Sequence, residues 1–193
     1  MKMSQILEWL SGGDLRSDGM ANETAEFVLN NPEMFEELLE GLTIPNDVIR
    51  GRTADAIEKV ARTKPELVIE HIPAIIQISK TDTVPMVKMH LAMLFGHLAV
   101  FDEKVEELIP ALFHLLDDTS VFARSWAITS LCIIGRKYTK ESDRIVNRIA
   151  PLYKDKSIAV RPKVLKAVNL LTNEGLPFPK GWIKSEHLRS LER

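Results

Sequence analysis

The five histidines are the side chains of this 193-residue sequence best suited to acid–base or metal chemistry. Of these, His90 and His97 lie seven residues apart, which is about two helical turns or roughly 10 Å. Met93 lies between them, but its thioether is a poor zinc ligand. The sequence holds no paired-cysteine motif, no glycine-rich phosphate loop and no EF-hand pattern. We therefore predict no metal, no cofactor, no catalytic residue and no enzymatic activity.

The elements that would position these side chains are helices. Leu, Ile, Ala, Glu and Lys dominate the composition, 45% of residues are hydrophobic and only 6% are aromatic, which favours helices over sheets. Prolines, glycines and short polar turns divide the apolar stretches. They predict helices over residues 4–10, 20–30, 32–42, 48–62, 65–80, 85–101, 103–118, 121–138, 141–155 and 158–173, with a short one near the C-terminus.

From residue 32 onward these helices recur in pairs. The second helix of each pair has a basic residue in its first turn: Arg50, Lys88, Arg124 and Arg161. Successive members of this set are 38, 36 and 37 residues apart. An aspartate lies six residues before three of them: Asp82, Asp118 and Asp155. A regular period of this length, with two helices per unit, is typical of an α-solenoid, in which each helix pair stacks on the next.

These pairs resemble the HEAT-repeat family, whose unit has a proline in its first helix, an aspartate in the turn and a Val-Arg pair opening the second helix. Ile72-Pro73 and Ile109-Pro110 match the proline, and Val160-Arg161 matches the pair. The first unit lacks the proline, and Ala123 replaces the valine in another. The resemblance covers roughly residues 32–173. It implies an all-α fold, an α-α superhelix of about four HEAT-like helix pairs with capping helices at both ends.

The resemblance also implies one repeat domain spanning residues 1–193. Residues 1–31 are predicted to be N-terminal capping helices, and residues 174–193 a C-terminal cap in which Phe178 and Trp182 cover the apolar face of the last repeat. The repeats lie between them, at 32–62, 65–101, 103–138 and 141–173. The turn aspartates and the basic residues are predicted to be structural. Such an aspartate can cap helix amides and can pair with the arginine of its own or the adjacent repeat.

By the same resemblance, the second helix of each pair lines the inner surface of the curve. Positions two, five and nine residues beyond each basic residue share one helical face, away from the core stripe. We take the following as candidate partner-binding residues: Arg52, His90, Met93, His97, Trp126, Thr129, Lys163 and Lys166. A central tryptophan on an amphipathic surface suits a protein or peptide segment. The alternative is that Met93, Trp126 and Ile133 pack between neighbouring repeats.

The net charge of −2 conceals an uneven distribution. Residues 1–120 carry a net charge of −11, and residues 121–193 carry +9. Basic residues between 121 and 166 could contact the phosphates of a nucleic acid. A HEAT-like DNA glycosylase would also need a carboxylate beside its aromatic residue, whereas the turn after Trp126 offers Thr129 and Ser130. We therefore predict a non-catalytic scaffold or adaptor that binds a protein or peptide partner, with nucleic-acid binding through the basic third as the alternative.

The sequence also bears on location. No stretch approaches the ~20 apolar residues of a membrane span, and the N-terminal MKMSQILEWL lacks the pattern of a secretory signal. We expect a cytoplasmic protein without a membrane partner, and the sequence leaves its oligomeric state open. The single cysteine, Cys132, lies in the apolar run LCIIG and is expected to be a buried core residue.

Overall fold

The computed structural model describes residues 4–192, and these residues form helices joined by turns, with no strand. The α-helices are α1 (Gln5–Leu10), α2 (Ala21–Asn30), α3 (Phe35–Glu40), α4 (Asp47–Thr63), α5 (Ile72–Thr81), α6 (Pro85–His97), α7 (Val105–Leu115), α8 (Val121–Lys137), α9 (Ser142–Ile149) and α10 (Val160–Thr172). The 3₁₀ helices are η1 (Pro32–Met34), η2 (Gly41–Thr43), η3 (Pro65–His71), η4 (Leu98–Val100), η5 (Asp102–Lys104), η6 (Thr139–Glu141), η7 (Ala150–Lys154) and η8 (Glu186–Glu192).

The predicted helices are present, and three of them end at least three residues earlier than expected, the one predicted over 103–118 at Leu115. The helix predicted over 141–155 stops at Ile149, and Pro151 lies in the 3₁₀ turn that follows, because proline cannot donate the hydrogen bond that would continue an α-helix. The helix predicted over 85–101 tightens into a 3₁₀ turn after His97. Among the described helices, none combines the length and the apolar composition that crossing a bilayer requires.

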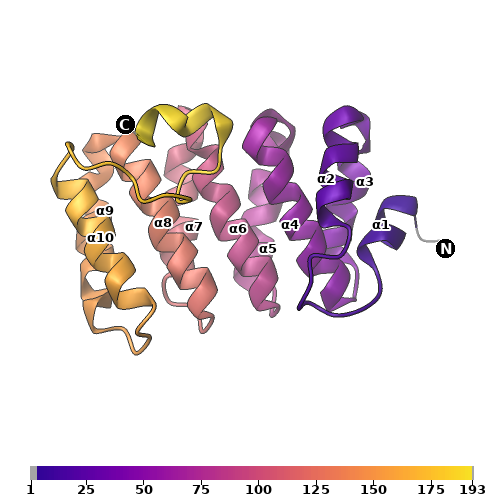
Figure 1. The fold of residues 1–193 in the computed structure, drawn as a ribbon, viewed down its shortest axis with the longest axis horizontal. Coiled ribbons are helices and arrows are strands. Elements are labelled where there is room, and N and C mark those ends of the chain that lie inside the picture. Colours follow the sequence, from indigo (N-terminus) through magenta and orange to yellow (C-terminus); the bar gives the residue numbers. More distant parts are fainter. Residues whose placement is uncertain (1–3, 193) are drawn as a thin grey trace.

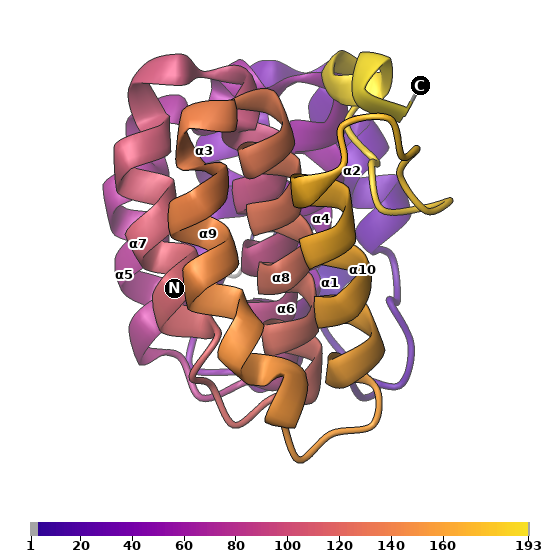
Figure 2. The same cartoon turned by 90° about the vertical axis from the view of Figure 1, so that its left-hand side faces the viewer.

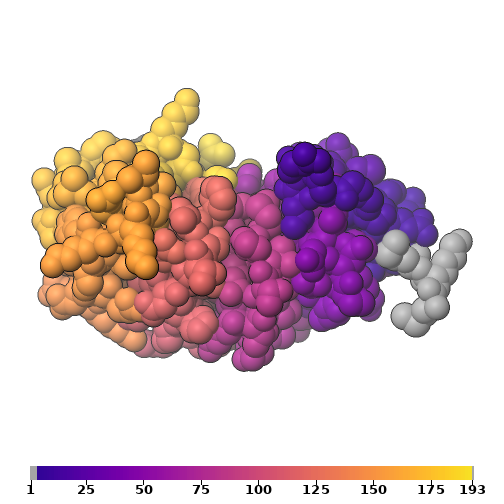
Figure 3. All heavy atoms as spheres, turned by 90° about the horizontal axis from the view of Figure 1, so that it is seen from below, coloured from indigo at the N-terminus to yellow at the C-terminus, as the bar shows by residue number. Residues whose placement is uncertain are grey.

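The helices lie in two rows (Figure 1). The even-numbered helices from α2 to α10 form one row, in which each helix packs on the next, and the odd-numbered helices from α3 to α9 form the row behind it. Figure 2 shows the two rows from the α10 end, with the stretch after α10 outermost on the side of the even row. Figure 3 shows that this side is hollowed between the two ends of the molecule, while the opposite side bulges outward. The chain therefore forms a curved stack of helix pairs.

Small residues allow α6 and α8 to pack closely in the middle of the even row. Gly96 on α6 faces Ser130 on α8, and a Cβ atom at Gly96 would lie 2.6 Å from Ser130 Oγ. Ser130 Oγ donates a hydrogen bond of 2.6 Å to the Ala92 carbonyl, so this buried hydroxyl is satisfied across the two helices. Cys132 is buried on the same helix, as predicted, and burial raises the pKa of its thiol to about 12.

Ion pairs join successive helix pairs at the turns that precede the even-numbered helices. Each joins the basic residue of one repeat to the turn aspartate of the next: Arg50 Nε to Asp82 Oδ2 at 2.8 Å, Lys88 Nζ to Asp118 Oδ2 at 2.5 Å, and Arg124 Nε to Asp155 Oδ2 at 3.0 Å. The other oxygen of each aspartate accepts a hydrogen bond from the amide two residues further on. We call these three pairs the turn ladder. They confirm the predicted structural role for three of the four basic residues, with the carboxylate partner in the adjacent repeat, whereas Arg161 is exposed and has no ion-pair partner among the described residues.

Residues 174–192, here called the C-terminal segment, turn back from α10 and cross the even row (Figure 1). Arg136 on α8 holds the start of the segment by donating hydrogen bonds to the carbonyls of Glu174 and Leu176, at 2.5 and 2.8 Å. Near the other end, His187 Nε2 lies 2.8 Å from the carbonyl oxygen of Thr63, the last residue of α4. The segment therefore extends from α10 back to α4.

This path extends beyond the predicted cap on the last repeat. Phe178 and Trp182 are buried, but Phe178 packs against Arg136 of α8, with the guanidinium carbon 5.5 Å from the ring centroid. Leu165 on α10 remains 51% exposed. Pro177 and Pro179 keep this stretch from forming a helix, because proline fixes φ and restricts the residue before it. The contacts of Arg136 then direct the extended chain over the even row.

Candidate functional site

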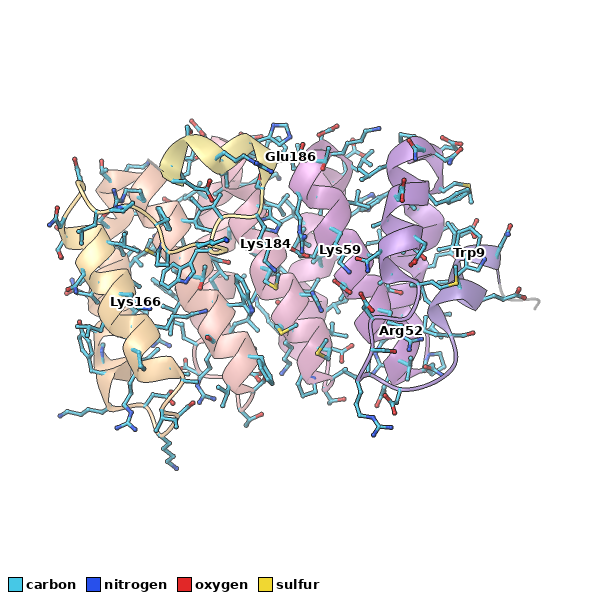
Figure 4. The ribbon with its side chains drawn as sticks, in the orientation of Figure 1. Trp9, Arg52, Lys59, Lys166, Lys184 and Glu186 are labelled. Atoms are coloured by element: carbon cyan, nitrogen blue, oxygen red, sulfur yellow. The ribbon has the colours of Figure 1, made fainter. Side chains whose placement is uncertain are left out.

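The even-numbered helices and the C-terminal segment meet at one surface (Figure 4). We call it the inner face, meaning the sides of α4, α6, α8 and α10 that the segment covers. Four apolar side chains of the segment are buried there: Phe178, Trp182, Ile183 and Leu188. Within residues 4–192, the hydrogen bonds between the segment and the helices use the side chains of Arg136 and His187, and none joins backbone to backbone. The segment is therefore held mainly by side-chain packing.

Trp126 on α8 is partly buried and contacts two ammonium groups from different elements. Lys163 Nζ of α10 and Lys184 Nζ of the C-terminal segment each lie 4.8 Å from the Trp126 ring centroid. Lys163 Nζ also lies 5.4 Å from the ring centroid of Trp182. These distances allow cation–π interactions, each worth about 0.5–2 kcal/mol depending on how far the cation is desolvated. We call these four side chains the indole–lysine cluster.

The two ammonium groups of the indole–lysine cluster crowd each other. Burial lowers the pKa of Lys163 to about 8, and the charges of Lys166 and Lys184 act in the same direction. Burial also lowers the pKa of Lys184, although the carboxylates of Glu58 and Asp55 act in the opposite direction. Each ammonium group of the cluster is therefore attracted by an indole ring and repelled by the other ammonium group.

Two histidines and two carboxylates meet between α4 and α6, next to the C-terminal segment. His97 Nε2 lies 2.6 Å from Glu58 Oε1, and His90 Nδ1 lies 3.5 Å from Asp55 Oδ1. All four side chains are buried, and Glu58 is 0% exposed. Burial alone would raise the pKa of Glu58, but the contacts with His97 and Arg62 hold it at about 2. We call these four residues, with Lys59 and Arg62, the α4–α6 network.

His90 is the member of this network with the fewest polar contacts. It is 6% exposed, and neither ring nitrogen has a hydrogen-bond partner among the described residues. Burial lowers the pKa of His90, with Asp55 and Glu58 acting in the opposite direction. The imidazole is therefore neutral at neutral pH, and it faces two carboxylates on the neighbouring helix.

Three side chains of the network could supply ligands to a divalent cation. One ligand atom each from Asp55, Glu58 and His90 lies within 4.8 Å of the others, and zinc accepts imidazole and carboxylate donors. Both carboxylates have cationic partners, however, since Lys59 Nζ lies 2.8 Å from Asp55 Oδ2 and Arg62 Nη2 lies 2.6 Å from Glu58 Oε2. We therefore interpret the network as an internal set of ion pairs that fixes α4 against α6.

Sequence reasoning missed this network because it considered His90 and His97 as a pair on one helix. In the structure each histidine contacts the neighbouring helix, His90 through Asp55 and His97 through Glu58. The sequence separations are 35 and 39 residues, close to the spacing of the basic residues. Positions about one repeat length apart lie side by side in a solenoid. A search for carboxylates about one repeat length before each histidine would have identified the network.

Three of the predicted partner-binding residues serve the fold in the structure. Arg52 is 5% exposed, and its Nη1 donates hydrogen bonds of 2.8–3.1 Å to the carbonyls of residues 10–12. It thereby fixes the loop between α1 and α2, beside which it lies in Figure 4. Met93 and Thr129 are buried, Met93 as the packing alternative expects. We leave these three out of the candidate site.

The other five predicted residues fall into three environments. Trp126 and Lys163 belong to the indole–lysine cluster. His90 and His97 belong to the buried α4–α6 network. Lys166 is exposed on α10 (Figure 4). The structure thus brings Trp126 and Lys163 together and adds Trp182 and Lys184, which sequence reasoning could not place because they lie outside the repeat.

Several basic residues of the last third contact groups within the chain. Arg136 binds carbonyls of the C-terminal segment, and the others form ion pairs: Lys137 with Asp102 at 3.3 Å, Arg144 with Glu141 at 3.2 Å, and Arg148 with Asp117 at 2.5 Å. Lys154, Lys156 and Lys166 are exposed and form no ion pair with the described residues. Part of the positive charge of this third is therefore paired within the fold, and part of it is exposed.

Comparison with known proteins bears on the fold. No family model and no curated protein sequence matches the chain. Among solved structures, the designed armadillo repeat protein YIII(Dq)4CqI matches with a TM-score of 0.60 and 17% identity, over 98% of this chain and 88% of that chain. A second designed armadillo repeat protein, YIII(Dq.V1)4CPAF in complex with the peptide (KR)4, matches with a TM-score of 0.59 and 17% identity. That match covers 99% of this chain and 89% of the designed protein. The crystal structure of an engineered protein matches with a TM-score of 0.59 and 18% identity, over 86% of this chain and 79% of that chain.

The chain folds as an α-α superhelix. The identities to these solved structures, 16–18%, are those of a shared fold and carry no function with them. What this superhelix does must therefore be inferred from the residues of its inner face.

Proposed function

We propose that this superhelix is a non-catalytic scaffold or adaptor that binds an extended segment of a protein partner along its inner face. The observation that carries the proposal is the C-terminal segment. Residues 176–185 lie on the inner face without helix or strand structure, and Phe178, Trp182 and Ile183 are no more than 8% exposed. A surface that buries one extended segment has the apolar sites to bury another.

We further propose that the repeats are of the HEAT type, because the proline, turn aspartate and Val-Arg features match that family. One domain of residues 1–193 would then hold the four repeats, capped by residues 1–31 and 174–193, and would work in the cytoplasm. Helix α2 lies in the even row and packs on α4. The N-terminal cap thus extends the even row by one helix.

The solved complex of a designed armadillo repeat protein with the peptide (KR)4 supports the proposal by analogy. A superhelix of similar fold holds a short basic peptide in that complex. The inner face of this chain offers a group that attracts basic side chains, namely the Trp126 ring, 4.8 Å from the Nζ of Lys184.

Part of the even row remains open beside the C-terminal segment. A cleft lies between α2, α4 and the segment, lined by Glu26 and Leu29 on one side and by Lys184 and Glu186 on the other. Lys59 also lines this cleft, and Figure 4 shows Lys59, Lys184 and Glu186 from their different elements. The cleft gives a partner segment a place to bind before the C-terminal segment leaves.

We do not propose nucleic-acid binding as a second function. Arg136, Arg144 and Arg148 contact groups within the chain, so they are not free to bind phosphates. Trp126, the aromatic residue that a glycosylase would need, has the ammonium groups of Lys163 and Lys184 against its ring.

A binding titration on the full-length chain tests the proposal. In the variant Phe178→Ala/Trp182→Ala, here called the released variant, the C-terminal segment loses two buried aromatic side chains, each worth about 3 kcal/mol or more in a well-packed site. A fluorescein-labelled peptide with the sequence of residues 176–192 should bind the released variant saturably. It should bind the wild type more weakly, because the attached segment competes at an effective concentration in the millimolar range.

Matched tryptophan variants control this titration. Adding Trp126→Leu to the released variant should weaken peptide binding. Adding Trp9→Leu should not, because Trp9 lies at the other end of the molecule and packs edge-on against Phe27, with the ring centroids 5.3 Å apart. Thermal unfolding establishes that each variant is folded. The proposal is wrong if the folded released variant shows no saturable binding, or if both tryptophan variants weaken binding equally.

A further inference from the structure

The inner face receives one lysine of the C-terminal segment and leaves another in solvent. Lys184 is partly buried, with its Nζ 4.8 Å from the Trp126 ring centroid. Lys180, four residues earlier, is exposed and makes no ion pair or cation–π contact within residues 4–192. The face therefore has a defined position for a cation and not merely a general attraction for lysines.

Groups from three helices surround that position. Helix α4 contributes two carboxylates and two cations, which oppose one another in their effect on Lys184: Asp55, Glu58, Lys59 and Arg62. Helix α10 contributes the like charge of Lys163, and α8 contributes the ring of Trp126. The fixed charges largely offset one another, so the negative face of the indole ring is the group that selects a cation at this position.

Trp182 and Lys184 contact the inner face as a pair. The Trp182 ring lies over Lys163 Nζ, 5.4 Å from ring centroid to nitrogen, while Lys184 Nζ lies over the Trp126 ring at 4.8 Å. The segment and the face each supply one ring and one ammonium group. An aromatic residue followed two positions later by a lysine satisfies both contacts at once.

We propose that the inner face recognises protein segments in which an aromatic residue is followed two positions later by lysine or arginine. Trp182 and Lys184 of this chain occupy that site until such a segment displaces them. The partner's aromatic ring then lies on Lys163, and its cation lies on Trp126. The inference rests on the proposed function, and it adds the chemistry of the partner and a competing role for the C-terminal segment.

The C-terminal segment is held by few hydrogen bonds, which favours its displacement by a partner. Beyond the contacts of Arg136, the described hydrogen bonds between helices and segment consist of the one between His187 and the Thr63 carbonyl, at 2.8 Å. Ser185 Oγ is buried without a hydrogen-bond partner among the described residues, which is unfavourable. The like charges of Lys163 and Lys184 also oppose the docked state. A partner segment that buries no unsatisfied hydroxyl can compete with the attached segment.

Three peptides titrated into the released variant test the recognition of the cation. They carry the sequence of residues 176–192 unchanged, with Lys184→Gln, or with Lys180→Gln. Lys184→Gln should weaken binding by about fivefold or more, as expected for a partly desolvated cation–π contact. Lys180→Gln removes the same charge from an exposed position, so that peptide should bind within about twofold of the native sequence.

Variants of Trp126 separate the ring contact from general attraction. In the released variant, Trp126→Phe retains a ring and should keep the discrimination between the native and Lys184→Gln peptides. Trp126→Leu should remove it, so that the two peptides bind with equal affinity. If all three peptides bind the released variant equally, the inference is overturned while the proposed function stands. If the native peptide does not bind at all, the proposed function fails as well.

Amide hydrogen exchange in the full-length wild type tests displacement. Saturating native-sequence peptide should speed exchange of residues 182–188, and the Lys184→Gln peptide at the same concentration should do so less. Unchanged exchange with the peptide bound would overturn displacement. A wild-type dimer that the peptide dissociates would assign the site to a second copy of this chain, and would also overturn the inference.

Discussion

Charged side chains are arranged in opposite ways in the turn ladder and on the inner face. In the ladder, each cation of one repeat has the aspartate of the next as its partner, as Arg124 has Asp155. On the inner face, Lys163 and Lys184 share one ring, and Ser185 Oγ is buried without a partner among the described residues. Paired charges stabilise the fold. Like charges and an unsatisfied polar group at one surface lower stability, and such groups are typical of functional sites.

The α4–α6 network lies beside the inner face, and its two carboxylates are paired with cations as the aspartates of the ladder are. We predict that Glu58→Ala lowers the free energy of unfolding by about 3–5 kcal/mol, because it leaves Arg62 and His97 without the buried carboxylate between them. Urea unfolding measures the loss, and Glu40→Ala, at an exposed position, should change stability by less than about 0.5 kcal/mol. A loss of similar size in both variants would place Glu58 outside the network that stabilises the fold.

The turn ladder offers a matched pair of arginines. Arg124 pairs with Asp155, whereas Arg161, at the corresponding position of the last repeat, is exposed and pairs with no described residue. Arg124→Ala should lower the free energy of unfolding by about 2 kcal/mol, since it removes charge-assisted hydrogen bonds from a partly buried aspartate. Arg161→Ala should have an effect within about 0.5 kcal/mol. Neither change should alter peptide affinity in the released variant. A loss of affinity in Arg124→Ala would contradict the separation of the turn ladder, which stabilises the fold, from the inner face, which binds the peptide.

The pH dependence of stability sharpens the assignment of Glu58. Its pKa in the folded chain is about 2, below the ordinary value of 4.5, so the charged carboxylate stabilises the fold above pH 4.5. That contribution is lost as the pH falls towards 2. The stability difference between the wild type and Glu58→Gln should therefore be constant near neutral pH and shrink between pH 4.5 and pH 2. A difference that stays constant over this range would contradict the lowered pKa.

A smaller effect is expected from Lys163 at alkaline pH. Its pKa is about 8 in the folded chain against an ordinary value of 10.5, so the unfolded chain holds more protons between these values and stability rises with pH there. Between pH 8 and pH 10.5, the thermal midpoint of the wild type should therefore rise relative to that of Lys163→Met. Lys166→Met, at an exposed position of the same helix, serves as the control and should show no such trend. Parallel curves for the wild type and Lys163→Met would contradict the lowered pKa of Lys163.

The features that sequence predicted are local or periodic. Helices follow from apolar spacing and from prolines at their starts, and the pairing of Arg124 with Asp155 follows from a motif that recurs at each repeat. The α-α superhelix is the consequence of these two patterns. Trp126 and Lys163 were predicted to share a face because positions at equal offset from the repeat's basic residue lie on corresponding sides of neighbouring helices.

The features that sequence did not predict depend on contacts between unlike parts of the chain. The C-terminal segment begins with prolines and has only a short helix at its end, so nothing local indicates that it turns back over the even row to reach Thr63. Arg52 binds backbone carbonyls of a distant loop, and any residue type could supply those. Lys184 acquires its role only because the path of the segment brings it to Trp126.

The central claim is that the inner face holds an extended segment through Trp126. Amide hydrogen exchange of residues 182–188 in two full-length variants, Trp126→Leu and Trp9→Leu, tests it most directly. Exchange should become faster in Trp126→Leu, where the ring under Lys184 is lost, and should remain at the wild-type rate in Trp9→Leu. Equal exchange rates in both variants would contradict the claim.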